Sequence, residues 1–397
     1  MNKEKITSFI CGLYIALGPI SWMSGMAVGP IKRVLLFLCL LLNIRFIISH
    51  KKSVASLIVV MISIYITMKV NAQIFDDYTN LFWGIIENFI VFLVGYNFVF
   101  SKFQDKGFLY VLLMPVSIAC LMTISNFLTG IPNWYAPSQY SIAESVQANQ
   151  YFVMKSLYET GFSWSRNGWG NSLALYLPLC FILRNYTKKI WYYIYIVIFI
   201  SILLSGTRNG VLSSLITLFF YLKYKNVFAS SKMIPALFAA GLVGLIVVSN
   251  SDFLIQILRL DAEDVSAGRM EQYQMIPILL TKMGFWGIGQ DESANLMLLL
   301  IGEYHQLHNT YFNTLVEFGY ILFFVVLGIT IRAIKIAIKS FKLRDERFFI
   351  LSLVLLSGLS SAMFEPRMVF GNLGGCCMWW FAFGLLCRNL NKNSVYE

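Results

Sequence analysis

Long apolar runs recur from one end of this 397-residue sequence to the other. Each is about 17 to 23 residues long, the length that a helix needs to cross the hydrocarbon core of a bilayer. The helices of a soluble protein would interrupt such runs with a polar face. Here 58% of the residues are hydrophobic and only 13% are charged. The sequence therefore predicts an all-α integral membrane protein.

We predict about twelve transmembrane helices in a single polytopic membrane domain, residues 1–397. Their ranges are 6–24, 34–49, 54–71, 80–100, 107–128, 168–184, 189–206, 208–224, 233–250, 309–331, 347–363 and 370–388. Two connections are much longer than the others, at about 129–167 and 251–308. Within the second loop, 270–282 is typical of a short amphipathic helix, and 295–301 is apolar enough to lie on the bilayer surface.

The distribution of positive charge predicts the orientation of the chain. With the N-terminus inside, 20 of the 31 lysines and arginines face the cytoplasm and 10 face the other side. Such an excess marks the cytoplasmic face, so we expect a multi-pass protein with both termini in the cytoplasm. The net charge of +11 is thus a topology signal, and it does not indicate a nucleic-acid partner. The seven cysteines fall in apolar segments, which indicates buried hydrophobic side chains without a disulfide framework.

One arginine lies in a tight turn between two apolar helices, in the segment Ser205-Gly206-Thr207-Arg208-Asn209-Gly210. Two interpretations are open for Arg208. Its side chain could extend to the phosphates of lipid headgroups. Alternatively, its guanidinium could bind a phosphate or pyrophosphate in a fixed geometry, with glycines that let backbone N–H groups approach the anion.

Three further arginines lie on the same predicted face. Arg166 precedes Asn-Gly, and it either anchors the start of a helix or contacts a ligand. Arg269 lies in a loop rich in acidic residues, where a solvated salt bridge is the alternative to a ligand contact. Arg367, in Glu365-Pro366-Arg367, adds one more candidate cation.

Two of the three histidines, His305 and His308, come just before the predicted helix 309–331. The dipole at a helix N-terminus disfavours a cationic imidazole, which suits a neutral general base at His308. The alternative is a histidine that only caps the helix or bonds at the interface. Asn309, Asn313 and Glu317 share one polar stripe at helical spacing. No cysteine or carboxylate set accompanies the histidines at zinc-like spacing, so we predict no metal and no cofactor.

These motifs, in this order, resemble the O-antigen ligase and O-antigen polymerase superfamily of bacterial inner membranes. The segment 205–210 resembles the family's Ser-Gly-Ser/Thr-Arg-Gly turn. Gly268-Arg269 with Gly284-Phe285-Trp286-Gly287-Ile288-Gly289 resembles its Arg…Leu-x-Gly-x-Gly segment. His308-Asn309, followed by Glu317 and Gly319, resembles its His-Asn-x-x-Leu…Glu-x-Gly segment. The resemblance covers roughly residues 160–330.

Residues 167–174 resemble the start of the preceding helix in the family, with two departures. Gly170-Asn171 stands where Pro-Asn is usual, and Asn209 stands where the arginine turn usually has glycine. The first 160 residues show no comparable match. The core arginine and histidine are unaffected by these departures.

The resemblance implies a GT-C-like, metal-independent glycosyltransferase that acts on the periplasmic face of the bacterial inner membrane. Its donor would be an undecaprenyl-diphosphate-linked glycan, with the polyprenyl tail among membrane lipid. Arg208, Arg269 and Arg166 would hold the diphosphate, and His308 would activate the acceptor hydroxyl. We expect supporting roles for His305, Asn309, Glu317 and Arg367.

We expect an O-antigen (surface polysaccharide) polymerase, whose acceptor is a glycan. The alternative is an O-antigen ligase, whose acceptor is lipid A-core. A less favoured alternative is a transporter of lipid-linked oligosaccharides, which would place polar groups near the bilayer midplane. After glycan transfer and transport, a purely structural protein is the third class of function.

Overall fold

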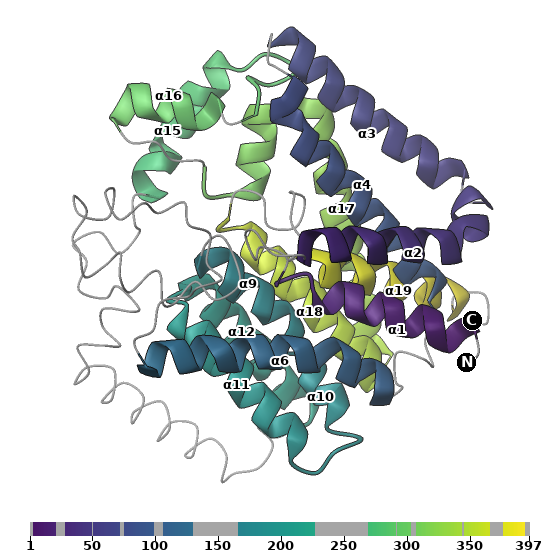
Figure 1. Cartoon of the computed structure of the whole chain (residues 1–397). Coiled ribbons are helices and arrows are strands. Elements are labelled where there is room, and N and C mark those ends of the chain that lie inside the picture. Colours follow the sequence, from purple (N-terminus) through teal and green to yellow (C-terminus); the bar gives the residue numbers. More distant parts are fainter. Residues whose placement is uncertain are drawn as a thin grey trace.

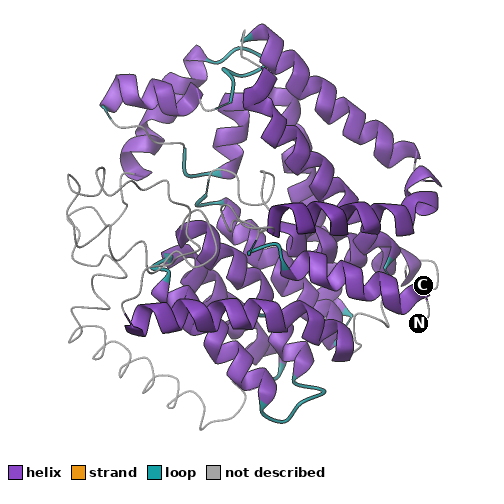
Figure 2. Ribbon diagram, in the orientation of Figure 1, coloured by secondary structure: helices purple, strands orange, loops and turns teal. Residues whose placement is uncertain are grey.

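The computed structural model describes residues 3–20, 28–49, 51–71, 75–98, 106–129, 166–226, 269–290, 292–302, 307–343, 345–365 and 376–393. Every regular element within these ranges is a helix, as Figure 2 shows. The prediction of an all-α fold is confirmed for this part of the chain.

Fourteen helices are described, and Figure 1 labels them. They are α1 (Lys3–Ala16), α2 (Val28–Ser49), α3 (Lys51–Val70), α4 (Phe75–Asn97), α6 (Lys106–Thr129), α9 (Arg166–Tyr176), α10 (Leu179–Leu183), α11 (Ile190–Leu204), α12 (Arg208–Tyr224), α15 (Arg269–Lys282), α16 (Glu292–Ile301), α17 (Thr310–Lys342), α18 (Glu346–Ala362) and α19 (Cys377–Asn393). Eleven of the twelve predicted spans overlap these helices. The remaining one, 233–250, lies outside the described residues.

Two helices of the described part are long and apolar enough to cross a bilayer by length and composition. They are Lys106–Asn126 within α6 and Thr310–Lys342, which is α17. The count of about twelve spans and the GT-C-like arrangement therefore stay predictions.

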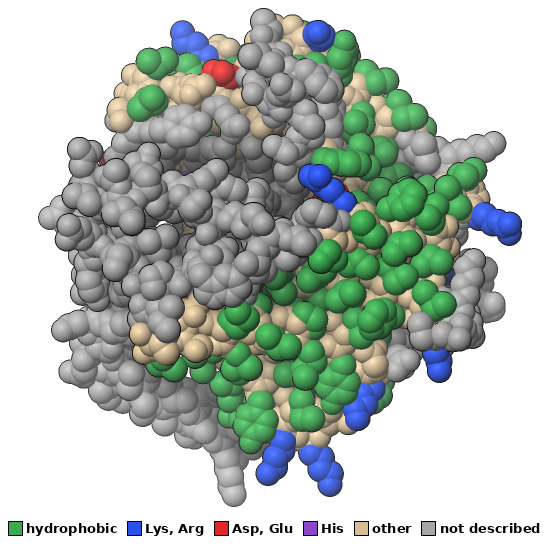
Figure 3. Space-filling model, in the orientation of Figure 1, with side chains coloured by type: hydrophobic (Ala, Val, Ile, Leu, Met, Phe, Trp, Pro, Cys, Tyr) green, Lys and Arg blue, Asp and Glu red, His purple; other side chains and the backbone are tan. Residues whose placement is uncertain are grey.

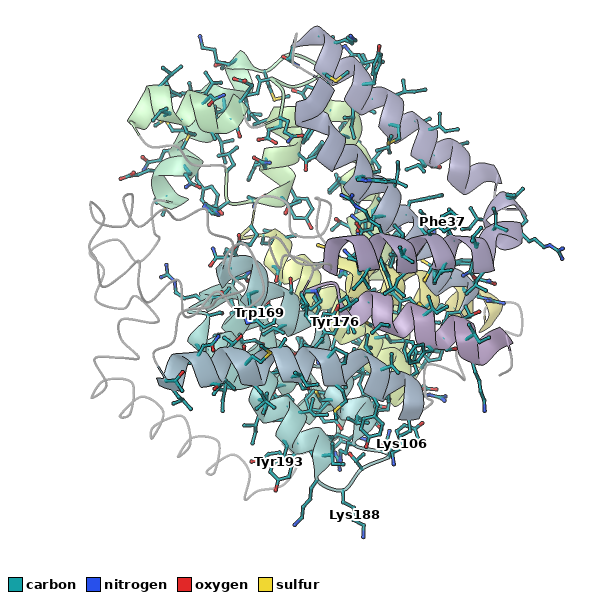
Figure 4. All side chains as sticks on the ribbon, viewed as in Figure 1. Phe37, Lys106, Trp169, Tyr176, Lys188 and Tyr193 are labelled. Carbon is teal, nitrogen blue, oxygen red and sulfur yellow. The ribbon has the colours of Figure 1, made fainter. Side chains whose placement is uncertain are left out.

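The predicted span 168–184 is broken in the structure. Helix α9 ends at Tyr176, and α10 begins at Leu179 after a turn through Leu177 and Pro178. Proline has no backbone N–H and cannot continue the helical bonding, which accounts for the break. Despite its short length, α9 is central. Trp169 and Tyr176 are fully buried, and they are labelled in the interior in Figure 4. The Tyr176 hydroxyl donates a 2.6 Å hydrogen bond to the Ile15 carbonyl, which joins α9 to α1.

The face seen in Figure 3 carries a broad area of hydrophobic side chains, while lysines and arginines gather mainly at its margins. Phe9, Phe37 and Ile118, from α1, α2 and α6, are among the exposed residues. Lys106 and Lys188 extend at the lower edge in Figure 4. An exposed apolar area with charges at its border is typical of the surface that a membrane protein presents to lipid.

A buried ion pair joins the first helices. Lys32 Nζ lies 2.5 Å from Glu87 Oε1, and both side chains are largely buried. The Tyr14 hydroxyl donates to the same carboxylate oxygen, and Cys377 Sγ lies 3.6 Å from it. A lone buried charge is costly, so the pair explains how the buried part of α4 can contain a glutamate.

Helix α17 bends sharply at Gly319, where φ is 75° and ψ is −170°. The bend frees backbone groups that a regular helix would use internally. The Val316 and Glu317 carbonyls accept 2.9 Å hydrogen bonds from Ile288 N and Gly289 N. Tyr320 N donates to the Phe285 carbonyl at 3.1 Å. The glycine-rich segment after α15 therefore docks into the break in α17, and it carries α15 and α16 with it (upper left in Figure 1).

Candidate active site

Arg208 is the first residue of α12 and follows a turn held by its own hydroxyls. Ser205 Oγ donates to the Ile202 carbonyl at 2.6 Å and lies 2.9 Å from Thr207 Oγ1. Gly206 has a positive φ of 64°, which glycine adopts without strain. Thr207 stands at the N-cap, but its side chain makes no capping bond to α12. A guanidinium and the positive end of a helix dipole thus coincide at Arg208, a combination that favours anions.

Helix α9 lies directly against this turn. A Cβ atom added to Gly170 would lie 2.7 Å from Thr207 Oγ1, and one added to Gly210 would lie 2.9 Å from the Gly170 carbonyl oxygen. Only glycine at both positions allows this approach, which explains why glycine stands at 170. Arg166 is the first residue of α9, about one turn before Gly170. The starts of α9 and α12 therefore lie side by side; the Arg166 side chain is outside the described part.

The start of α17 is attached to the end of α18. Asn309 caps α17, because its Oδ1 accepts from Tyr311 N at 3.0 Å and Phe312 N at 3.1 Å. Its Nδ2 donates to the Met363 carbonyl at 3.2 Å. Thr310 Oγ1 donates to the Glu365 carbonyl at 2.6 Å. Two consecutive residues thus fix α17 to the segment that follows α18.

The start of α12 is attached to the same end of α18. Asn209 Nδ2 donates to the Ser361 carbonyl at 3.4 Å, and Ser213 Oγ lies 3.0 Å from Ser360 Oγ. The residues next to Arg208 and His308, which are 100 positions apart in the sequence, therefore bond to one short segment, 361–365.

His308 has contacts to α15 and to the segment that follows α18. Its Nδ1 lies 3.9 Å from Glu365 Oε2, and its backbone N–H donates to Gln272 Oε1 at 3.2 Å. Gln272 is buried in the first turn of α15, three residues after Arg269, which begins that helix. The structure thus brings the start of α15 to His308. The Arg269 side chain lies outside the described part.

Glu365 changes the electrostatic argument made from the sequence. The helix dipole disfavours a cation at an N-terminus by about 0.3–1 kcal/mol. Two opposite charges about 4 Å apart near a protein surface attract each other by about 4 kcal/mol. The Glu365 carboxylate, 3.9 Å from His308 Nδ1, thus places a negative charge beside the imidazole that the argument from the dipole had left out.

Glu317 is bonded within the protein. It is fully buried, and its carboxylate accepts from Ser293 Oγ at 2.9 Å and from Asn313 Nδ2 at 3.1 Å. It lies seven residues into α17, roughly 10 Å along the axis from Thr310. The predicted polar stripe thus divides into two parts. Asn309 caps the helix, whereas Asn313 and Glu317 join α17 to α16.

His305 and Arg367 lie outside the described residues. Among the residues that the structure does describe, no group of three or more histidine, cysteine, aspartate or glutamate side chains could hold a metal ion. The seven cysteines, all of which are described, are buried free thiols.

A group of buried polar atoms next to Arg208 was not anticipated. Asn171 is fully buried, and neither atom of its amide has a hydrogen-bond partner within the described ranges. Asn209 Oδ1 and Ser361 Oγ are also buried without a hydrogen-bond partner among the described residues. Ser357 Oγ donates to the Ala174 carbonyl at 3.3 Å, and Asn171 and Ser361 lie one turn along their helices from that contact. Each such atom costs about 1–3 kcal/mol, so a group of them is typical of a site kept for function.

Glu365 and Gln272 were also missed as partners of His308. The only signal in the sequence was the charged group Glu365-Pro366-Arg367 between two apolar runs. Gln272 carried no signal, because a glutamine in an amphipathic helix is ordinarily exposed.

Residues 193–327 match a family model described as O-antigen ligase. The matched range runs from α11 into α17, and it includes Arg208, Arg269 and His308. No curated protein and no solved structure matches the chain significantly.

Proposed function

We propose that this chain, which carries in residues 193–327 a domain of the O-antigen ligase and polymerase superfamily, is a glycosyltransferase of the periplasmic membrane face. It transfers a glycan from undecaprenyl diphosphate to a sugar hydroxyl. One observation supports this above all. The helix starts that carry Arg208 and His308 are both hydrogen-bonded to the segment 361–365. An anion-binding group and a base are thereby held at one end of one helix.

In the proposed reaction, the acceptor hydroxyl oxygen attacks the anomeric carbon of the lipid-linked sugar. His308 accepts the hydroxyl proton as the new glycosidic bond forms. The bond from the anomeric carbon to the diphosphate oxygen breaks, and its electron pair leaves with the lipid diphosphate. Arg208, Arg269 and Arg166, each the first residue of a helix, stabilise the charge that develops there. The proposal requires no metal and no cofactor.

The first form of this proposal is an O-antigen polymerase, whose acceptor is a sugar of another glycan. The second form is an O-antigen ligase with a lipid A-core acceptor, and the family match is compatible with both forms. Both forms assume a single domain of about twelve spans in a GT-C-like arrangement, with both termini in the cytoplasm. A transporter is less favoured, because the candidate residues gather at the ends of helices rather than along a central passage.

The test uses cells that make the polysaccharide and lack the endogenous copy of this protein. Arg208→Ala or His308→Ala should abolish long glycan chains on a gel at unchanged protein level. Arg33→Ala is the matched control, because Arg33 is an exposed arginine of α2, and it should restore the full ladder. Normal ladders from both site variants would contradict the proposal.

The same gel separates the two forms. Cells without a ligase retain full-length polymer on the lipid carrier. Cells without a polymerase carry single repeat units on the core.

A further inference from the structure

We infer that Glu365 is a positioning residue for His308. Its carboxylate holds the imidazole with Nδ1 turned inward, so that Nε2 on the opposite side of the ring points to the acceptor hydroxyl. This inference rests on the proposed glycosyl transfer. Glu365 also lies 38 residues beyond the end of the matched family domain, so the pairing links that domain to α18.

Neighbouring hydrogen bonds fix the backbones of the pair close together. The two side chains face each other, with Nδ1 3.9 Å from Oε2. The two residues after His308 are bonded to the backbone of the 363–365 segment, at 3.2 Å from Asn309 and 2.6 Å from Thr310. The backbone N–H of His308 itself is bonded to Gln272. The backbones that carry the carboxylate and the imidazole therefore cannot move apart without breaking these bonds.

A positioning carboxylate should be more buried than the imidazole that it orients, and the two side chains differ in this way. The Glu365 side chain is 12% exposed and the His308 side chain is 26% exposed. The carboxylate thus lies behind the imidazole, and the imidazole keeps a surface for substrate. A carboxylate in this place fixes the tautomer and orientation of a histidine base.

The step that Glu365 assists is the proton transfer. The acceptor hydroxyl gives its proton to Nε2 while its oxygen bonds to the anomeric carbon and the diphosphate leaves. The resulting imidazolium carries N–H on both nitrogens, and the Nδ1–H is directed at Glu365. The 3.9 Å separation closes by about 1 Å to form a hydrogen bond, as contacts of catalytic groups often do when substrate is bound. The proton then passes to solvent.

The experiment compares four variants in the complemented cells described above, with their endogenous lipid-linked glycan as the donor. Glu365→Gln keeps the shape and the backbone acceptor but removes the charge. It should lower the rate of long-chain formation about 10- to 100-fold, by analogy with the loss of a carboxylate partner from a metal-bound histidine. Glu365→Asp should recover activity to within a few-fold of wild type. The unfolding temperature of each purified full-length variant should equal that of the wild-type protein.

The third variant is His308→Ala, and the fourth combines it with Glu365→Gln. Because Glu365 acts only through His308, the double variant should be no less active than His308→Ala. The control is Glu346→Gln, which removes an ion-paired glutamate from the opposite end of α18, where its Oε1 lies 2.7 Å from Lys225 Nζ. It should leave chain formation unchanged.

Three results would overturn the inference: normal chain formation by Glu365→Gln, an equal loss with Glu365→Asp, or a loss that accompanies a lower unfolding temperature. Each of them leaves the proposed function intact if His308→Ala is still inactive. Normal chains from His308→Ala would instead remove the proposed function itself.

Discussion

The backbones of Gly287 and Gly319 meet so closely that neither position has room for a side chain. A Cβ atom on Gly287 would lie 2.6 Å from Gly319 N, and one on Gly319 would lie 2.7 Å from Gly287 N. Both residues also have a positive φ, of 81° and 75°. The glycine-rich segment 284–289 and Gly319 thus form one backbone contact, which holds α15 and α16 against α17.

The first prediction concerns this contact. Gly319→Ala should lower the free energy of unfolding by at least about 1–2 kcal/mol, the cost of a left-handed conformation for a residue with a Cβ atom. The collision with the 285–287 backbone adds to this cost. Glycan chain formation should fall as α15 moves away from His308. Gly328→Ala, in the same helix but with open space around the added Cβ atom, should be neutral or slightly stabilising. Thermal unfolding of both purified proteins checks the difference, and equal unfolding temperatures would contradict the docking.

The second prediction compares two helix caps. Asn309 caps α17 at the candidate site, and Asp345 caps α18 at its other end, where its side chain accepts from Arg347 N. Asn309→Ala and Asp345→Ala should each cost about 0.5–2 kcal/mol of stability. Only Asn309→Ala should also lower activity per folded molecule, because Asn309 holds His308 beside Glu365. Equal activity of the two variants, at equal amounts of folded protein, would argue against a site at the start of α17.

The third prediction is a pH dependence at Asp345. Burial alone would raise the pKa of this carboxyl group, but hydrogen bonds from the side chain and backbone of Arg347 lower it by more, so that its pKa lies below its usual value. A lowered pKa stabilises the fold at pH values above the unfolded pKa of about 3.9, and the stabilisation is lost as pH falls through the folded value. Asp345→Asn keeps a good cap but loses the ion pair. Its small deficit in unfolding temperature at pH 7 should disappear in acid; a deficit that persists there would exclude the ion pair as its cause.

The fourth prediction concerns the buried pair of Lys32 and Glu87. Removing one partner leaves an uncompensated charge, so Lys32→Met or Glu87→Gln should cost about 3–5 kcal/mol and reduce the amount of protein in the membrane. The double variant Lys32→Met/Glu87→Leu should recover much of that loss, because no charge is left buried. Immunoblots of membrane fractions measure this. A double variant that accumulates less than either single variant would show that the pair does more than neutralise charge.

Apolar run length was sufficient to place most of the helices, because a helix that crosses a bilayer needs a fixed length of apolar sequence. Turn chemistry was also informative. The glycines at 284, 287 and 289 ended α15 as expected, and Asn309 preceded α17 as capping residues do. The positions of Arg208, Arg269 and Arg166 at helix starts follow from the same local rules.

Contacts between helix ends could not be predicted in this way. Nothing in the periodicity of residues 346–365 says that they meet Asn209 on one side and Thr310 on the other. The partnership of Glu365 with His308 has the same character, since it depends on tertiary packing between two segments. Glu317 shows the opposite failure. The sequence pattern placed it on a polar stripe of the helix near a histidine, which suggested a role at the site. In the structure its side chain instead accepts a hydrogen bond from Ser293 of α16, and the sequence did not show where that helix packs.

The attachment of α12 and α17 to the end of α18 has a consequence for how the protein is made. Chains are synthesised from the N-terminus, and α18 follows α12 by more than 120 residues. A nascent chain that has already inserted Arg208 and His308 still lacks the surface that brings them together. The proposed centre would therefore assemble only after α18 has been synthesised, and under the proposed function an incomplete chain would not act on lipid-linked sugar.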